Sequence, residues 1–137
     1  MKRTVLLSVL SAGLVAVLAM PAWANLDTQC QSGNNICGKL SYYTQNGQQI
    51  TVKAETHTYN GNTATLRVIV NYETHHWWGW VTDGSNDSGN KAGVSSTGWY
   101  KLSFICNGSE YKYYSSHWRG GTNYFTITGQ PFTPAGC

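Results

Sequence analysis

Charged residues are scarce in this sequence. They make up 11% of the 137 residues, whereas soluble domains carry about a quarter. The formal net charge is +3. Two of the nine basic residues, Lys2 and Arg3, lie near the start of the chain, and without them positions 25–137 hold seven basic and six acidic residues, a net charge of +1. We therefore expect no nucleic-acid binding through a basic patch and no strong attraction to anionic lipid.

Several motifs of catalysis and metal binding are also absent. The chain has no Gly-x-Ser-x-Gly elbow, so a serine hydrolase is not indicated. It has neither Cys-x-x-Cys nor His-x-x-x-His spacing, and the adjacent His75 and His76 would point to opposite faces of a strand. The run from Asp83 to Asn90 fails the calcium-loop pattern, because Ser88 replaces the required glycine and Val94 the required glutamate. We expect no metal and no cofactor.

A single apolar run is long enough to suggest targeting. It extends from Val5 to Met20, follows two basic residues, and is closed by Pro21 and the small-residue site Ala22-Trp23-Ala24. This order is typical of a secretory signal peptide, and the run is too short for a convincing membrane span. We expect a signal peptide over residues 1–24, cleavage after Ala24, and a single secreted or periplasmic domain over residues 25–137.

The four cysteines fit an exported protein. An even number of cysteines in an exported chain of this size predicts two disulfides, and three pairings are possible. We favour Cys30–Cys37, which closes a small loop, and Cys106–Cys137, which ties the C-terminal tail to the sheet.

Beyond the apolar run, hydrophobic residues alternate with polar ones between Asn-Gly and glycine-rich turns, which indicates an all-β domain. A three-residue loop at 60–62 predicts a hairpin in which Val52 faces Val70 and Ala54 faces Val68. The same register sets Glu55 opposite Arg67.

A second hairpin is predicted at Asn107-Gly108, a dipeptide that favours tight turns. It sets Phe104 opposite Tyr111 and Leu102 opposite Tyr113. Further strands are expected over residues 39–44, 77–82 and 123–128, with a long polar loop between residues 83 and 98. Together they predict a disulfide-stapled two-layer antiparallel β-sandwich, or a small barrel, of about seven strands.

The segment from His75 to Trp80 concentrates three indoles and two imidazoles. In a strand, His76, Trp78 and Trp80 would share one face, and His75, Trp77 and Gly79 the other. We expect one of these faces to build core and the other to meet a partner. A second aromatic and polar patch, which includes Trp118 and Arg119, is expected to line the same rim.

The leading interpretation is a non-catalytic binding protein for a glycan or cell-envelope polymer. Indoles stack on the apolar faces of sugar rings while neighbouring polar groups bond the hydroxyls, and exposed apolar patches usually mark a partner. The residues assigned to this surface are His76, Trp77, Trp78, Trp80, Trp118 and Arg119. The same indoles would also suit a membrane surface, as in a secreted membrane-active toxin. A protein inhibitor or adhesin is a further alternative.

A catalytic alternative rests on Glu55, His57 and Arg67. By the hairpin register they share one outer face, where they would supply a general base, a general acid and a phosphate clamp. The set resembles the His, Glu and Arg cluster of small secreted microbial ribonucleases in residue types, without a shared motif or spacing. Exposed Glu–Arg pairs across strands are common and mostly solvated, so we favour a protein that is not an enzyme.

Overall fold

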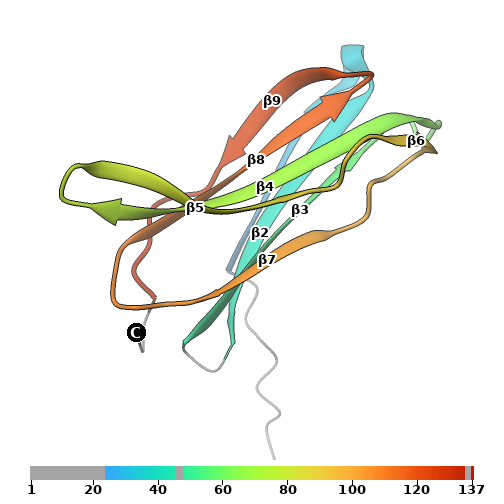
Figure 1. Ribbon diagram of the computed structural model, residues 1–137. Coiled ribbons are helices and arrows are strands. Elements are labelled where there is room, and N and C mark those ends of the chain that lie inside the picture. Colours follow the sequence, from blue (N-terminus) through green and yellow to red (C-terminus); the bar gives the residue numbers. More distant parts are fainter. Residues whose placement is uncertain (1–23, 46–47, 135–136) are drawn as a thin grey trace, which may run out of the picture.

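The computed structural model describes residues 24–45, 48–134 and 137, and they form two antiparallel β-sheets packed face to face (Figure 1). The prediction of an all-β, two-layer fold is confirmed, with nine strands over the described residues in place of about seven. Of these residues, none belongs to a helix long and apolar enough to cross a membrane. The predicted signal peptide lies outside the described residues, except Ala24, at which the first strand begins.

The elements follow one another with short connections. In chain order they are β1 (Ala24–Gln31), the short 3-10 helix η1 (Ser32–Asn34), β2 (Ile36–Gln45), β3 (Gln49–His57), β4 (Ala64–His76), β5 (Gly79–Asp87), β6 (Lys91–Val94), β7 (Tyr100–Ile105), β8 (Tyr111–Arg119) and β9 (Thr122–Thr128).

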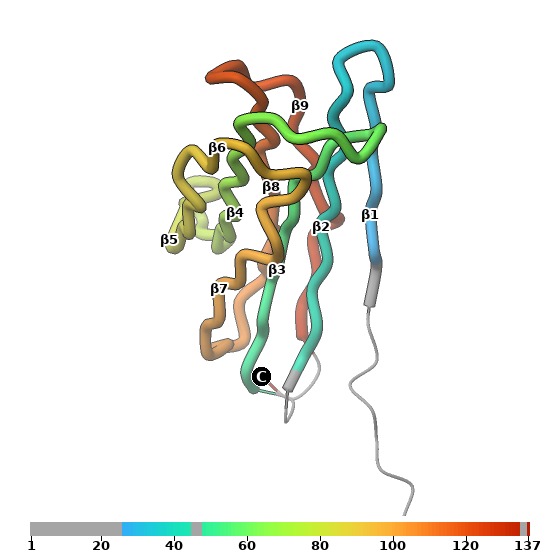
Figure 2. Tube along the Cα trace, turned by 90° about the vertical axis from the view of Figure 1, so that its right-hand side faces the viewer, coloured from blue at the N-terminus to red at the C-terminus, as the bar shows by residue number. Residues whose placement is uncertain are grey.

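Each layer combines strands that are distant in sequence. Sheet A has the order β1-β2-β3-β7, and sheet B the order β5-β4-β8-β9, with β6 also paired to β4 (Figures 1 and 2). The predicted strands over residues 39–44 and 123–128 are found as β2 and β9.

The two predicted hairpins are wrong in their pairing. β3 and β4 lie in different sheets, and so do β7 and β8. β3 pairs instead with β7, Val52 opposite Leu102, while β4 pairs with β8, Val70 opposite Ser115. Both connections therefore cross from one layer to the other.

Their lengths permit this crossing. Facing sheets lie roughly 10 Å apart, about twice the spacing of paired strands. A two-residue turn closes only the shorter distance, whereas the connections over residues 58–63 and 106–110 bridge the longer one. Asn107 still forms a local turn, since its Oδ1 accepts from the Ser109 backbone N–H at 3.1 Å, but that turn belongs to a crossing loop.

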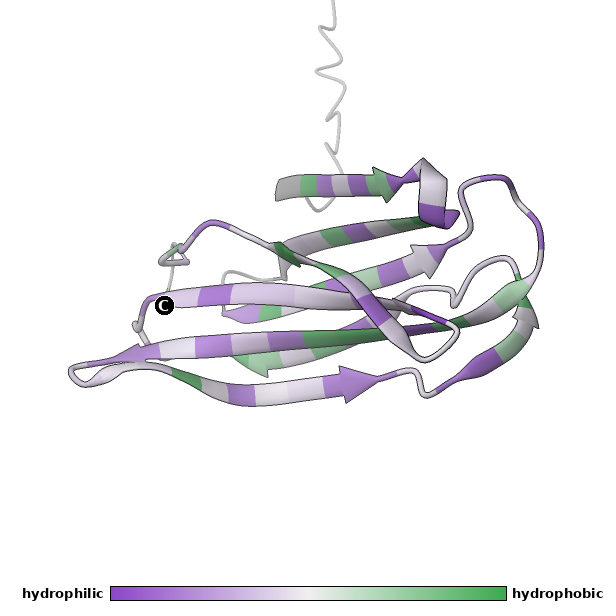
Figure 3. Ribbon diagram, turned by 90° about the horizontal axis from the view of Figure 1, so that it is seen from above, coloured by the Kyte–Doolittle hydropathy of each residue, from purple (hydrophilic) through white to green (hydrophobic). Residues whose placement is uncertain are grey.

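The predicted apolar faces are nevertheless correct, because they meet across the interior. Val52, Ala54, Val68 and Val70 are all fully buried. The rings of Tyr72 and Phe104, from opposite sheets, stack with centroids 3.9 Å apart. Figure 3 shows the corresponding alternation of hydrophilic and hydrophobic residues along the strands.

Both predicted disulfides are present. Cys30 and Cys37 are direct partners in the β1–β2 ladder, so their bridge joins two strands of sheet A. The Cys106–Cys137 bridge fastens the C-terminal residue beside the end of β7. Such bridges suit a small domain in an oxidising compartment.

The side chain of His117 lies inside the core, together with other polar groups. It is fully buried, stacks on Phe125, and fills the space beside Gly38, where an added Cβ would lie 2.5 Å from the imidazole ring. Its Nδ1 lies 2.7 Å from Thr56 Oγ1 and its Nε2 lies 2.8 Å from Ser115 Oγ.

The hydrogen bonds of this cluster indicate the tautomer of His117. The Thr56 hydroxyl donates its one hydrogen to the backbone oxygen of Arg67 at 3.1 Å. It must then accept from His117, so Nδ1 carries the proton and Nε2 accepts from Ser115. In this arrangement both nitrogens of the neutral imidazole are hydrogen-bonded.

Substitution of Gly38 by alanine should destabilise the fold. The new methyl group would overlap a ring that is held by two hydrogen bonds, and such overpacking costs about 1–3 kcal/mol. Urea denaturation measures the change in unfolding free energy. Gly33→Ala is the matched control, since nothing lies within 4 Å of its added Cβ and its stability should be unchanged. Equal stabilities of the two variants would contradict the close packing of Gly38 and His117.

The stability should fall as the pH is lowered through the range set by His117. Burial first, and the neighbouring His57 second, lower the pKa of His117 from 6.5 to about 3. Between these values the unfolded chain takes up a proton that the folded protein excludes, so stability is complete above pH 6.5 and is lost towards pH 3. The slope contributed is up to about 1.4 kcal/mol per pH unit.

Denaturation curves of the wild type and of His117→Gln between pH 7 and pH 4 would isolate this contribution, because all other titrating groups are common to both. Identical slopes in the two proteins would rule it out.

Candidate functional site

The aromatic segment forms the tip of a hairpin between β4 and β5. We call residues 75–80 the tryptophan hairpin. β4 pairs with β8 as far as Thr74, opposite Tyr111, and one more backbone bond joins the His75 N–H to the Glu110 oxygen at 2.9 Å. Beyond His75 the strand continues with β5 alone. The tip therefore projects past the sandwich (Figure 1).

Trp77 and Trp78 are the two residues of the turn, because His76 pairs directly with Gly79. The predicted strand over residues 77–82 is thus wrong at its first two positions, and alternation does not apply to them. Gly79 has a φ of +129°, a conformation that side-chain-bearing residues rarely adopt, so glycine follows the two indoles where the chain reverses.

The indoles of the turn are strongly exposed. Trp77 is 92% exposed and Trp78 is 60% exposed, while Trp80 is partly buried. The expectation that one face of this segment builds core is wrong, since neither Trp77 nor Trp78 reaches the space between the sheets. The reason is that the β4–β8 ladder ends at Thr74, so only β4 and β5 extend to the tip.

Ring contacts order the tip without a partner. The rings of His76 and Trp78 stack 4.6 Å apart, and Trp77 meets Trp78 edge-on at 5.2 Å. On the other face of the hairpin, His75 stacks on Trp80 at 4.7 Å. Trp77 remains the most exposed of these rings.

A polar network adjoins the hairpin on the outer face of sheet B. The Lys112 ammonium lies 4.8 Å from the centre of the Trp80 ring and 2.9 Å from Glu73. The Thr82 hydroxyl lies 3.4 Å from both Glu73 and the Tyr114 hydroxyl. Hydrogen-bonding groups of several kinds therefore surround an indole.

The segment predicted as a long polar loop, residues 83–98, is largely strand. Its first part completes β5 and a later part forms β6 on the same edge of β4. Asp87 accepts two hydrogen bonds from Arg67, and these bonds lower the pKa of the Asp87 carboxyl. Backbone pairing therefore orders this segment despite its polar composition.

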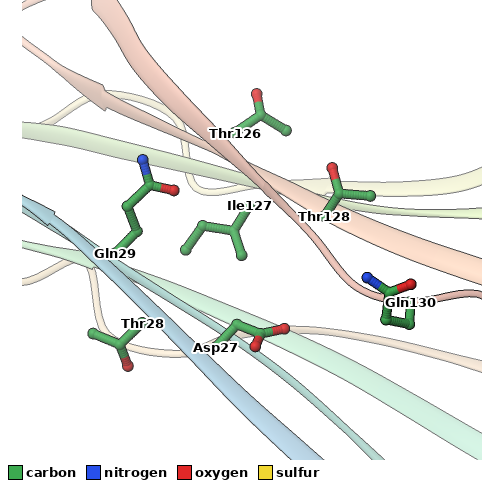
Figure 4. A pocket seen from close by; sticks show the side chains of 7 residues that line it. All are labelled: Asp27, Thr28, Gln29, Thr126, Ile127, Thr128 and Gln130. Atoms are coloured by element: carbon green, nitrogen blue, oxygen red, sulfur yellow. The ribbon is translucent and has the colours of Figure 1, made fainter.

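A groove lies between β1 and β9, the edge strands of the two sheets on the side away from β5. It has a volume of about 450 Å³. Figure 4 shows the Ile127 side chain between the two strands, with polar side chains around it. Thr126 and Thr128 line the groove and also belong to the outer face of sheet B, since they pair with Ser116 and Tyr114.

Trp118 and Arg119 lie at the other end of the sandwich. Trp118 pairs with Arg67, ten positions from Trp77 along β4, which separates them by about 30 Å. The expectation that they line one rim with the tryptophan hairpin is therefore wrong. Trp118 packs instead beneath the Arg67 guanidinium, 5.4 Å from its ring centre.

The structure does not assemble the alternative catalytic set. Glu55 and His57 are on β3 in sheet A, and Arg67 is on β4, where it faces outward from sheet B. Glu55 accepts a 2.6 Å hydrogen bond from Ser96 and lies 3.9 Å from Lys39. Burial, and then the positive charge of Lys39, lower the pKa of His57. The predicted shared face fails because the hairpin that defined it does not form.

Sequence reasoning missed the hydrogen-bonded Ser115–His117 pair. Its distance of 2.8 Å resembles that of a nucleophile and its base, but both residues are fully buried in the core. A substrate cannot reach them, so the pair is structural. The alternation of polar residues in β8 hid it, since Ser115 and His117 occupy positions that normally hold apolar side chains.

No group of three or more His, Cys, Asp or Glu side chains in the described part of the chain is arranged as metal ligands. Comparisons of the sequence with protein-family models and with curated proteins find no match. The arrangement of the tryptophan hairpin and its polar surroundings is therefore the main guide to function.

Replacement of Trp77 by alanine should leave stability within about 0.5 kcal/mol of the wild type, since a side chain that is 92% exposed makes little packing contribution. Urea denaturation measures it. The fully buried Tyr113 provides the contrast, and Tyr113→Ala should cost roughly 3–5 kcal/mol. Iodide quenching of tryptophan fluorescence should fall in Trp77→Ala. A loss of stability comparable with that of Tyr113→Ala would mean that Trp77 is part of the core.

Proposed function

We propose that this chain is an exported, non-catalytic binding protein that recognises a polysaccharide of the cell envelope through the tryptophan hairpin and the outer face of sheet B. The exposure of Trp77 and Trp78 at an ordered tip is the main support. Burial of an indole against a partner is worth roughly 25 cal/mol per Å² of apolar surface. An ordered ring also loses little further freedom on binding.

The surroundings of the hairpin suit sugars. A sugar ring presents C–H groups on its faces and hydroxyls at its rim, so its receptor needs aromatic planes beside donors and acceptors. Trp77 supplies an open plane, and the adjoining network offers a carboxylate, an ammonium and hydroxyls from Glu73, Lys112 and Thr82. The ion pair between Glu73 and Lys112 keeps this region close to neutral, which suits an uncharged chain.

The outer face also suits an extended chain rather than a single sugar. Hydroxyls continue from Thr82 to Tyr114 on β8 and to Thr126 and Thr128 on β9, where the β1–β9 groove begins. The groove is lined mostly by polar side chains: Asp27, Thr28, Gln29, Thr126, Thr128 and Gln130. A polymer laid across the four strands would meet hydrogen-bonding groups along its length.

Export is part of this proposal. Two disulfides staple the domain, and disulfides persist in oxidising compartments such as the periplasm or the medium. An envelope polymer is accessible to a protein in either place.

Docking to a lipid surface is a second candidate, supported by the position of the two most exposed indoles at the apex of a projecting hairpin. Trp favours the membrane interface. However, the polar network beside Trp80 and the hydroxyl-bearing face would have no role in this case, and we favour the polysaccharide.

The double variant Trp77→Ala/Trp78→Ala should lose retention on polysaccharide by at least about tenfold, because a few aromatic anchors dominate such binding. Co-sedimentation with insoluble cellulose, chitin and peptidoglycan measures the retention. Trp118→Ala is the matched control, since it removes an indole at the opposite end of the sandwich and should bind normally.

Vesicles of neutral and of anionic phospholipid, sedimented in parallel, distinguish the two candidates. Binding to vesicles alone, lost in the double variant, would replace the polysaccharide by a membrane. Equal retention of the double variant and Trp118→Ala would show that the tryptophan hairpin is not the binding site.

A further inference from the structure

A small pocket lies at the end of the sandwich opposite the tryptophan hairpin. Its volume is about 320 Å³, and its walls come from the start of β4, the end of β8 and the beginning of β9. Figure 1 shows the β8–β9 turn at this far end. Three threonines, Thr63, Thr65 and Thr122, line the pocket together with Tyr124 and Arg119.

The pocket is built by backbone structure and not by flexible loops. Arg119 pairs with Thr122 across a two-residue turn, in which Gly120 and Gly121 have φ values of +57° and +82°. Positive φ at both positions matches the tight turns that close β-hairpins. The Gly120 N–H donates to the Thr65 backbone oxygen at 2.9 Å and so ties this turn to β4.

Arg119 is the one charged residue that lines the pocket. Among the described residues no carboxylate lies within ion-pair distance of its guanidinium, in contrast to Arg67, which pairs with Asp87. Its Nη1 donates to the Asn34 backbone oxygen at 3.2 Å, and this contact holds the side chain in place. Its Nε is shielded from solvent and has no hydrogen-bond partner among the same residues.

A guanidinium that has no carboxylate partner favours an anion. Among the described residues, the hydroxyls of the three threonines that line the pocket with Arg119 have no hydrogen-bond partner, so they are available as donors. Hydrogen bonds from a cation and hydroxyls to an oxyanion are about twice as strong as neutral ones. The absence of any acidic side chain from the lining removes the usual competitor.

We propose that this pocket binds an oxyanion, the carboxylate of an acidic sugar or a phosphate group, through Arg119 and the hydroxyls of Thr65 and Thr122. The site is separate from the tryptophan hairpin and does not depend on the function proposed for it. A single ligand that filled both sites would have to span about 30 Å.

Titrations with glucuronate, glucose and inorganic phosphate at low ionic strength, followed by amide NMR shifts, test the site. We expect saturable binding of an oxyanion and none of glucose. Arg119→Gln should weaken binding at least about tenfold. Arg67→Gln is the matched control, because it removes a cation from the same end of the sandwich outside the pocket, and its binding should be unchanged.

The double variant Thr65→Val/Thr122→Val keeps Arg119 and its contact to Asn34, and should weaken binding several-fold. It tests the proposal even if Arg119→Gln fails to fold. Binding of glucuronate alone would identify an acidic sugar as the ligand, and binding of phosphate alone a phosphate group; both support the site. The proposal is overturned by absent oxyanion binding, by equal binding of glucose, or by an equal loss in Arg67→Gln.

Discussion

The backbone pairing of β4 is the constraint on which the rest of the structure depends. Strand β4 is thirteen residues long and pairs with β8 on one side and with β5 and β6 on the other. Its inward side chains include Val68 and Val70, which are fully buried against sheet A. Because the ladder with β8 ends at Thr74, the last residues of β4 leave the sandwich and carry the tryptophan hairpin with them.

This overhang explains how a small β-domain presents exposed indoles. A tryptophan side chain buries roughly 150–250 Å² when it packs, so an exposed one gives up several kcal/mol of possible stabilisation. Within the sandwich such a ring would be drawn into the core. At the tip it has only its neighbours, and the contacts of Trp78 with His76 and Trp77 order the rings without covering them. The free energy of burying these indoles is therefore still available when a partner binds.

Alternation in the sequence predicted which side chains point inward but not which strands are neighbours. Val52 and Val70 are buried whether β3 and β4 pair in one sheet or face each other across two, so the apolar pattern is the same in both cases. The turn signals at Asn60–Asn62 and Asn107-Gly108 indicated pairing within one sheet, and this was wrong. The favoured cysteine pairing was correct, and it rested on the short loop between Cys30 and Cys37 and not on the order of the strands.

The uncertainty about which strands pair also explains which site residues could be predicted together. Trp77, Trp78 and Trp80 adjoin in sequence, so their grouping did not depend on topology. The grouping of Glu55 with Arg67, and of Trp118 with Trp77, required long-range pairings that the sequence left open, and neither is formed. His117 was hidden for another reason. Its polarity suggested the surface, whereas Gly38 on the facing strand leaves room for a neutral imidazole inside the core.

The polar groups fall into two sets, one that stabilises the core and one that is available to a ligand. Thr56, Ser115 and His117 are buried and satisfy one another, so they stabilise the core and cannot exchange partners without unfolding it. The hydroxyls of the outer face and the Arg119 guanidinium are incompletely paired and reach solvent-accessible hollows.

Because the two-layer core is rigid, the tryptophan hairpin and the Arg119 pocket are held at a fixed separation. A ligand that spans both must match that distance, which restricts the candidates to long, chain-like molecules.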